Sequence, residues 1–172
     1  MKNQSPENIS TYLLVENGHY PNNGKLPLLI VGRVFEDNRV SAERFEQLFS
    51  AHSWPAAWRN GLYNVHHYHS TAHEALGIYS GWVEACFGGP GGPVVKAETG
   101  DVIIIPAGVS HCNVGQSADF RVVGAYPQGQ VWDMKYGTVG ERPDVDRIIA
   151  GVALPTADPV FGTGGPLETF WR

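Results

Sequence analysis

The sequence predicts an all-β domain of the sandwich or barrel kind, with one short helix before the barrel. Its 21 glycines and 12 prolines fall between short apolar runs, and from Gly61 onward these runs follow one another at the spacing of strands joined by tight turns. The 172 residues suit one domain that buries a core without disulfides. We therefore expect a single domain over residues 1–172, with the core barrel at about 61–127 and both terminal arms packed on it.

The first expected elements are two strands and a helix, in an order that apolar runs and caps indicate. The strands are expected at residues 11–15 and 26–35. Ser41 can cap a helix whose apolar face carries Phe45, Leu48 and Phe49 at helical spacing. His52 ends this face and is expected to be packed or partly exposed rather than to act as a ligand.

The barrel itself is expected as a series of short strands. They are predicted at residues 62–69, 74–79, 82–87, 94–98, 102–105, 110–114 and 120–126. After a short helix at 144–150, the chain is rich in Gly and Pro until Leu167, Phe170 and Trp171. Such large apolar side chains indicate that the tail docks on the barrel or on a neighbouring subunit.

Charge and hydropathy exclude several classes of protein. The net charge is −5, with 12 Lys and Arg against 17 Asp and Glu and no basic stripe, so no nucleic-acid partner is expected. The polar start is not a signal peptide, and the apolar run 102–107 is too short to span a bilayer. We expect a cytoplasmic protein without a membrane partner, in which Cys86 and Cys112 are buried free thiols.

The histidines near residue 67 have the spacing of metal ligands. In a strand, residues i and i+2 face the same side about 7 Å apart, so His67 and His69 point one way while His66 and Tyr68 point the other. A turn of four residues then brings a carboxylate, Glu74, beside them. Two imidazoles and a carboxylate can converge on one ion.

A third imidazole must come from a distant strand. His111 is the candidate, because it follows the Pro106-Ala107-Gly108 turn that reverses the strand at 102–105. Each feature alone has a simpler explanation: paired histidines are more often packing or surface residues, and Glu74 at a strand start is usually a solvated charge. Their ordered combination favours a metal site at His67, His69, Glu74 and His111.

This combination resembles the two motifs of the cupin superfamily. Gly61, five residues, His67-Tyr68-His69, four residues, Glu74, six residues and Gly81 match the first motif at every fixed position. Gly100, five residues, Pro106-Ala107-Gly108, two residues and His111 match the second through its histidine, whereas Gly115 stands where an Asn is usual. The resemblance implies a jelly-roll β-barrel that holds one ion on three histidines and one glutamate.

Further segments resemble the YjlB-type cupin-domain proteins over nearly the whole chain. They are Pro21-Asn22-Asn23, Trp58-Arg59-Asn60-Gly61, His66-His67-Tyr68-His69-Ser70, Ala125-Tyr126-Pro127-Gln128-Gly129-Gln130, Gly140-Glu141-Arg142-Pro143 and Asp158-Pro159-Val160. This likeness implies a fold and a metal site but no substrate. Cupins include dioxygenases, isomerases, decarboxylases and binders, so the fold alone does not decide.

Several side chains near the motifs leave alternatives open. His73 has the shorter spacing that the cupin motif tolerates and competes with Glu74, which we favour because its charge balances a divalent ion. Three tryptophans, Trp58, Trp82 and Trp132, are expected in the core or an interface, with substrate stacking as an alternative for one of them. Two arginines, Arg59 and Arg121, are expected in surface salt bridges rather than on an anionic substrate. Cys112 should face away from the metal.

Two functions remain. The first is a metal-dependent enzyme of the dioxygenase, isomerase or decarboxylase type, which acts on a small molecule inside the barrel with Glu74 as the catalytic carboxylate and Fe, Mn, Ni or Zn as the ion. The second is a non-catalytic small-molecule binder or sensor with a structural metal. The open kind of ligand set favours the enzyme. The aromatic arms and the family resemblance also imply a homodimer.

Overall fold

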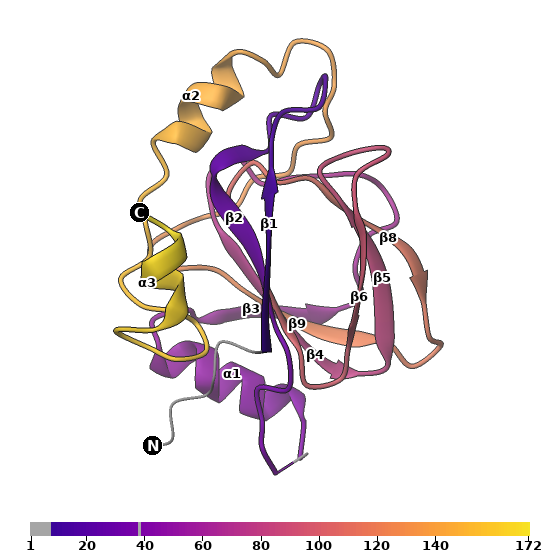
Figure 1. Cartoon of the computed structure of the whole chain (residues 1–172), viewed down its shortest axis with the longest axis vertical. Coiled ribbons are helices and arrows are strands. Elements are labelled where there is room, and N and C mark those ends of the chain that lie inside the picture. Colours follow the sequence, from indigo (N-terminus) through magenta and orange to yellow (C-terminus); the bar gives the residue numbers. More distant parts are fainter. Residues whose placement is uncertain (1–7, 38) are drawn as a thin grey trace.

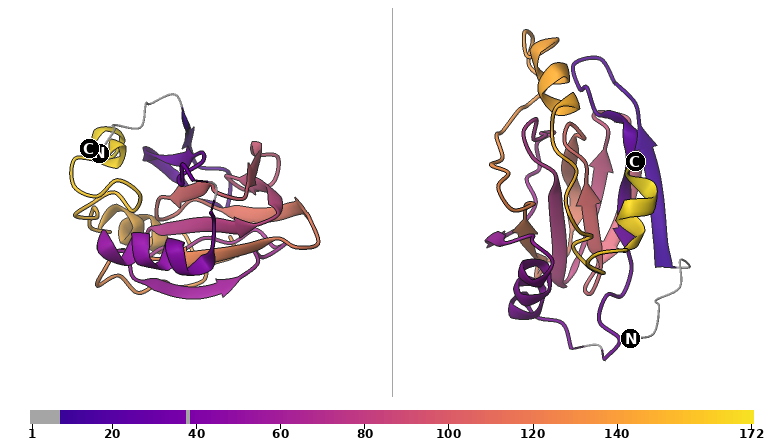
Figure 2. Two further views of the ribbon diagram at one scale, coloured as in Figure 1. Left: turned by 90° about the horizontal axis from the view of Figure 1, so that it is seen from below. Right: turned by 90° about the vertical axis from the view of Figure 1, so that its left-hand side faces the viewer.

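Two antiparallel sheets form the body of the molecule (Figures 1 and 2). The computed structural model describes residues 8–37 and 39–172, so much of the polar start on which the signal-peptide prediction rests lies outside the described residues. The larger sheet has the order β1-β2-β7-β4-β9-β3 and the smaller one β6-β5-β8. The strands are β1 (Ile9–Leu14), β2 (Asn23–Val31), β3 (Ala56–Asn60), β4 (Glu74–Ser80), β5 (Trp82–Phe87), β6 (Val94–Glu98), β7 (Val102–Ile105), β8 (His111–Gln116) and β9 (Arg121–Ala125). The all-β jelly-roll prediction is confirmed.

Both faces of the central part of the larger sheet are buried, which explains the unbroken apolar runs of its inner strands. Within β2, Leu28 and Ile30 belong to a cluster shared with the smaller sheet, whereas Leu29 and Val31 belong to a cluster shared with the first helix and the C-terminal tail. Side chains alternate between the faces of a strand. Consecutive apolar residues therefore fill two different cores, one inside the barrel and one outside it.

The helix α1 (Ala42–Ala51) covers the outer face of the larger sheet (Figure 1). Ser41 caps it by accepting a hydrogen bond from the Arg44 N–H, as expected. Phe45 is fully buried against β4, where a Cβ on Gly77 would lie 2.6 Å from the ring. The helix packs this closely because the strand carries a glycine beneath the ring.

The C-terminal tail docks on the same outer core. After α2 (Asp144–Ala150), the chain forms a short helix, α3 (Pro166–Phe170). Leu167 and Trp171 are buried, and the Trp171 indole N–H donates to the Pro27 carbonyl on β2 at 2.8 Å. These two residues thus pack on the outer core, whereas Phe170 stays 39% exposed.

The predicted strand at 62–69 is wrong, because the structure has only isolated bridges there. His67 pairs with His111, while Tyr68 pairs with Lys135. Consecutive residues thus take partners from two different segments, so no single ladder can extend along this stretch. The sequence reading also missed β3 and α3. By contrast, the strands at 82–87, 94–98 and 102–105 and the helix at 144–150 have the predicted bounds.

The N-terminal segment contributes directly to the barrel. β2 pairs with β7, and β1 pairs with β2 at the edge.

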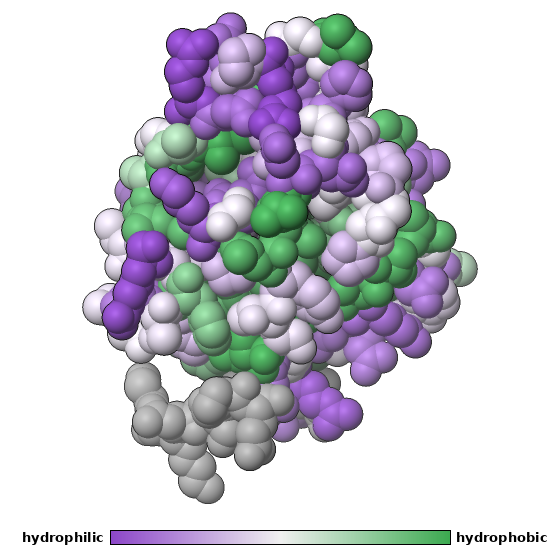
Figure 3. All heavy atoms as spheres, turned by 45° about the horizontal axis from the view of Figure 1, so that its top comes forward, coloured by the Kyte–Doolittle hydropathy of each residue, from purple (hydrophilic) through white to green (hydrophobic). Residues whose placement is uncertain are grey.

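The face shown in Figure 3 has apolar residues in its middle and mostly hydrophilic ones near its top. Each helix within the described residues is too short or too polar to cross a bilayer.

Candidate metal centre

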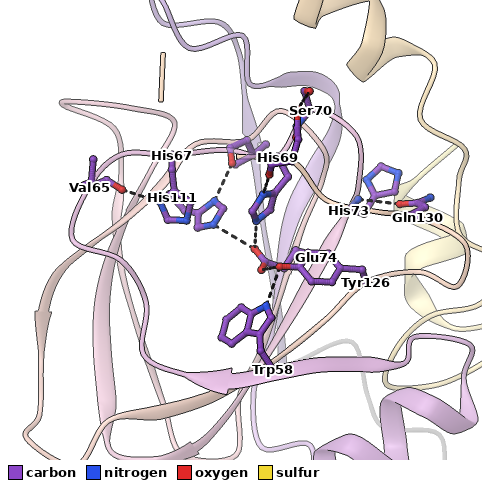
Figure 4. A network of polar contacts seen from close by, with 12 residues as sticks. Trp58, Val65, His67, His69, Ser70, His73, Glu74, His111, Tyr126 and Gln130 are labelled. Atoms are coloured by element: carbon purple, nitrogen blue, oxygen red, sulfur yellow. Dashed lines mark hydrogen bonds and ion pairs between the residues drawn. The ribbon is translucent and has the colours of Figure 1, made fainter. Parts of the chain in front are cut away.

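The four predicted site residues come from three separate places in the chain (Figure 4). His67 and His69 lie on the irregular segment before β4, Glu74 is the first residue of β4, and His111 is the first of β8. The bridge between His67 and His111 joins the first and last of these places. All four side chains are at least 95% buried. The fold therefore gathers them at one end of the barrel.

The turn before β8 sets the position of His111. Gly108 has φ +91°, and a Cβ there would lie 2.5 Å from the Asn22 carbonyl oxygen, so only glycine fits. The Gly108 N–H donates to the His69 carbonyl at 2.8 Å. The proline–alanine–glycine turn of the second motif thus connects the two histidine-bearing segments directly.

Backbone carbonyls orient all three imidazoles. The Nδ1 atom of His67 lies 2.7 Å from the Val65 carbonyl, and that of His111 lies 3.0 Å from the Val109 carbonyl. The Nδ1 atom of His69 contacts the Asp133 carbonyl. A carbonyl only accepts, so each Nδ1 carries a proton and each Nε2 has a free lone pair. This is the tautomer that metal-ligating histidines adopt.

The four side chains bring hydrogen-bond acceptor atoms close together, with no hydrogen-bond donor between them. One ring nitrogen from each of His67, His69 and His111 lies within 4.8 Å of the others. The Glu74 Oε2 atom lies 3.4 Å from the Nε2 of His69 and 3.3 Å from that of His111, and it has no hydrogen-bond partner. Four buried lone-pair atoms that converge need a positive charge between them. The three histidines could hold a metal ion, and this donor set fits one.

The pKa shifts follow from burial and from the mutual contacts. Burial lowers the pKa of His67 to about 3, and the nearby His111 adds to the effect. Burial also opposes the charge on His69, but the Glu74 carboxylate outweighs it and the pKa of His69 rises. Burial would likewise raise the pKa of Glu74, yet His69 and His111 hold it below its usual range. A metal ion binds neutral imidazoles and an ionised carboxylate, so protons on these groups compete with it.

A cavity of about 240 Å³ opens beside the four residues. Tyr126, at the end of β9, donates its hydroxyl proton to Glu74 Oε1 at 2.8 Å and accepts the Trp58 indole N–H at 3.0 Å. Burial, followed by the Glu74 charge, raises the pKa of Tyr126. Trp132 stacks on Tyr126, with ring centroids 4.5 Å apart and an interplanar angle of 5°. One oxygen of Glu74 is therefore held by Tyr126, and the other faces the histidines.

Trp58 reaches the cavity because its cross-strand neighbour is a glycine. Trp58 pairs with Gly124 between β3 and β9. A Cβ on Gly124 would lie 2.2 Å from the indole ring. The absence of a side chain allows the indole to lie flat across β9 and meet Tyr126.

His73, the competing ligand, lies in a different compartment. Its Nδ1 atom accepts the Ala107 N–H at 2.9 Å, and its ring packs on Trp171 with centroids 4.7 Å apart. The proton of its neutral ring is thus on Nε2, which leaves no lone pair there for a metal. Its backbone N–H donates to the Gln130 side chain (Figure 4). The structure places Glu74, and not His73, beside the three histidines.

The other singled-out side chains lie outside the cavity or on its wall. His66 packs on Tyr20, while Tyr68 donates its hydroxyl proton to Glu141 on the side away from the cavity. His52 packs against the Pro159 carbonyl, as expected. Trp82 packs beneath Lys96 outside the cavity, whereas Trp58 and Trp132 line it.

The structure agrees with the predictions for Arg59 and the two cysteines, but not with that for Arg121. Arg59 forms salt bridges with Glu43 and Glu46, as expected. Arg121 donates to the Phe120 carbonyl, and no salt bridge is found for it among the described residues. Cys86 and Cys112 are buried and free, which confirms that prediction.

Two contributors were missed in the sequence. Tyr126 directly follows the apolar strand β9 and resembles a core residue there, although it falls within one of the family-like segments. Asp133 acts on His69 through its backbone carbonyl, which any residue possesses. Its side chain also accepts hydrogen bonds from the Ser70 N–H, at 2.6 Å, and from the Ser70 hydroxyl. A backbone role has no signature in the sequence.

The jelly-roll barrel with inward-facing histidines defines the class: this is a cupin. No model of a known protein family matches the sequence. The Bacillus subtilis (strain 168) protein YjlB, described as uncharacterized, is 35% identical over 161 residues, which cover 94% of this chain and 95% of YjlB. The chain therefore belongs to the YjlB family.

Two solved structures share weaker similarity. A DUF861 family protein from Thermotoga maritima has 23% identity and a TM-score of 0.32, covering 49% of this chain and 89% of its own. The epimerase RmlC from Legionella pneumophila, solved with dTDP-4-keto-L-rhamnose, has 17% identity and a TM-score of 0.35. The match covers 70% of this chain and 72% of RmlC. Because both TM-scores are low, the fold class follows from the strand order of this chain and not from these structures.

Proposed function

We propose that the chain is a metal-dependent enzyme that acts on a small molecule inside the barrel, in the dioxygenase, isomerase or decarboxylase class. The supporting observation is the convergence of three imidazole nitrogens and the Glu74 carboxylate on the wall of a cavity. His67, His69, Glu74 and His111 would hold one divalent ion. Iron, manganese, nickel and zinc all accept such nitrogen and oxygen donors.

The position of the cavity supports a catalytic rather than a purely structural ion. Structural metal sites are closed by protein ligands, whereas catalytic sites keep an open position. All four proposed ligands line the same cavity of about 240 Å³. A bound ion supplies Lewis-acid activation of a substrate oxygen, or redox chemistry if it is iron.

The protein's own contribution centres on Glu74 and Tyr126. The Tyr126 hydroxyl donates to Glu74 Oε1 and is held in place by the Trp58 indole N–H. Glu74 is therefore positioned to accept a proton from a bound molecule, and Tyr126 to stabilise the carboxylate that results when the proton leaves. Trp58 acts as a positioning residue for this pair.

A non-catalytic binder is the second candidate, and one observation favours it. Among the described residues that line the cavity, the acid–base groups are the four proposed ligands, Tyr126 and Tyr63. The Tyr126 hydroxyl is already engaged with Glu74. An enzyme usually needs an acid or base close to the reacting atoms, so a site with few free groups also suits ligand sensing with a structural metal.

Metal removal separates the two functions. Metal content and thermal unfolding are measured for the wild type and for Glu74→Gln, each with and without a chelator. Glu46→Gln, a surface carboxylate that pairs with Arg59, is the matched control. For the enzyme, we expect chelation to lower the free energy of unfolding by about 3 kcal/mol, as for loss of a ligand present at 100 times its Kd, while the barrel stays folded.

The result for a structural ion differs in kind. The chelated chain would lose its cooperative unfolding transition, because the ion would be part of the fold. For the enzyme, Glu74→Gln should hold less metal than the wild type and remain folded, and Glu46→Gln should match the wild type. Equal metal content in the wild type and Glu74→Gln would refute Glu74 as a ligand.

The homodimer stays a prediction. Leu13 and Val15 are 56% and 65% exposed on and just after β1, the edge strand of the larger sheet. An exposed apolar edge offers a surface on which a second chain can pair. Light scattering at micromolar concentration should report twice the chain mass, and a monomer would contradict the prediction.

A further inference from the structure

We propose that the cavity binds a small, flat, uncharged molecule of one or two rings, whose oxygen atoms gather at a single end. This inference rests on the proposed function, because it places that polar end at the metal. Four properties of the cavity carry it: its charge, its hydrogen-bonding capacity, its aromatic walls and its volume.

The cavity has no cationic side chain for an anionic ligand. No Lys or Arg is among the described residues that line it. Arg59 stands between two lining residues, Trp58 and Asn60, but its guanidinium is bound to Glu43 and Glu46 outside. A phosphate or sulfonate remote from the metal would therefore be buried without a counter-charge, which is costly. Glu74 has Oε1 bound to Tyr126 and Oε2 beside the proposed metal position, so with the ion in place a cationic arm finds no free carboxylate either.

Several polar groups of the wall already have hydrogen-bond partners within the protein. The Trp58 N–H is bound to Tyr126, and the Tyr126 hydroxyl is bound to Glu74. The three histidines use Nδ1 on backbone carbonyls. A sugar-like molecule would leave several hydroxyls without partners after losing water, at a cost for each. A ligand with its oxygens at one end and an apolar body avoids this cost.

Aromatic faces form the apolar part of the wall. Trp58, Tyr63, Tyr126 and Trp132 all line the cavity. Offset or parallel packing of rings contributes beyond the area that is buried. The volume of about 240 Å³ exceeds the roughly 150 Å³ of an engineered cavity that takes benzene and falls short of the roughly 300 Å³ at which pockets for drug-sized ligands begin. One or two fused rings match this volume.

Trp132 is the residue that would recognise the flat body. Its indole stacks on Tyr126 and is still 41% exposed. The residues on either side are fixed: the Val131 carbonyl accepts the Thr71 hydroxyl at 2.7 Å, and the Asp133 carboxylate accepts the Ser70 N–H at 2.6 Å. A large indole is thus held firmly at the cavity while much of its surface is uncovered.

Three probes of related shape test the inference. Catechol is flat and uncharged, with adjacent oxygens. cis-1,2-Cyclohexanediol has the same oxygens on a puckered ring, and 4-sulfocatechol adds a remote negative charge. Titration calorimetry on the metal-containing protein should show catechol binding at least about tenfold tighter than either of the others, which corresponds to 1.4 kcal/mol.

Two tryptophan variants locate the binding. Trp132→Leu should weaken catechol binding about tenfold without changing metal content. Trp82→Leu is the matched control, because this tryptophan packs with Lys96 outside the cavity, and it should bind catechol as the wild type does. Chelation of stray metal by catechol in solution would not distinguish the two variants.

The outcomes separate this inference from the proposed function. Equal or tighter binding of 4-sulfocatechol would overturn the claim on charge, and equal binding of the cyclohexanediol would overturn the claim on flatness. If the protein holds metal but binds none of the probes, the inference fails and the metal site stands. If the protein takes up no metal when metal is supplied, yet catechol selectivity and its dependence on Trp132 persist, the proposed metal-dependent enzyme fails and the flat aromatic cavity stands without a metal at its polar end.

Discussion

His73 and Glu74 are neighbours in the chain, yet they lie in two different compartments. The buried imidazoles of these compartments have opposite hydrogen-bond roles at Nδ1. In the cavity, backbone carbonyls accept hydrogen bonds from the Nδ1 atoms of His67 and His111. The Nε2 atom of each ring therefore keeps a free lone pair at the cavity. At His73, a backbone N–H donates to Nδ1 and Trp171 covers the ring. Burial alone therefore does not mark a metal ligand. The backbone group that contacts Nδ1 decides whether Nε2 offers a lone pair to an ion.

The largest effect is expected where the closed compartment is opened. Trp171→Ala removes a nearly buried indole that covers His73 and donates to the Pro27 carbonyl. We expect the free energy of unfolding to fall by about 3–5 kcal/mol, measured by denaturant titration. Phe170→Ala, at a 39% exposed neighbour, should cost much less. If the compartments are separate, metal content at low temperature stays unchanged in both variants.

The next effect compares metal binding after replacement of two buried histidines, His111 and His73. His111→Gln removes a nitrogen that faces the cavity and should weaken metal binding by at least about 100-fold, because even loss of an outer partner costs 10- to 100-fold. His73→Gln keeps an acceptor for the Ala107 N–H and should bind metal as the wild type does. Equilibrium dialysis with elemental analysis measures both. If His73→Gln lost the metal and His111→Gln kept it, the comparison would be reversed.

A smaller effect is expected at Asp133, the hydrogen-bond partner of the proposed ligand His69. Asp133→Ala releases Ser70 and loosens the segment whose carbonyl orients His69. Metal affinity should fall by about tenfold, by the same dialysis measurement, while the fold is retained. Asp144→Ala, at an exposed residue paired with Arg147, is the control. An unchanged affinity in Asp133→Ala would show that the imidazole needs no such support.

The smallest effect is a difference in pH dependence. Burial lowers the pKa of His73 to about 4, below the value of about 6.5 in an unfolded chain. Between these values the unfolded chain binds more protons, so stability is full above pH 6.5 and falls as the pH drops toward 4. This histidine should cost about 1 kcal/mol between pH 6.5 and 5.5. Metal-free His73→Gln should show a shallower decline than the metal-free wild type, and identical slopes would contradict the assigned burial effect.

The sequence predicted the parts of the fold that depend on local pattern. The strands at 82–87 and 94–98 are bounded by turn residues and have the expected limits. Residues 62–69 have an equally apolar and aromatic pattern, but their backbone pairs with two distant segments at once. β3 (Ala56–Asn60) was missed because its pairing depends on the distant strand β9. Such pairings are decided by the tertiary structure and not by local preference.

The candidate site was predictable in its residues but not in its surroundings. The motif spacing named His67, His69, Glu74 and His111, and the structure brings these side chains together. The choice between His73 and Glu74 could not be made from spacing. Both residues follow the same turn, and they differ only in the side to which their side chains point. The Tyr126 contact with Glu74 joins residues 52 positions apart, and no local pattern records it.

The orientation of His69 has a consequence for the order of events as the chain is made. Its imidazole is fixed by a carbonyl 64 residues later, and its backbone carbonyl by Gly108. A ribosome releases the N-terminal part of a chain first, so the strands around residues 74–105 can begin to pair while His69 still lacks its partner. The ion-binding geometry is therefore among the last features to form during synthesis. A chain that stops before residue 133 would lack it even if the first strands had paired.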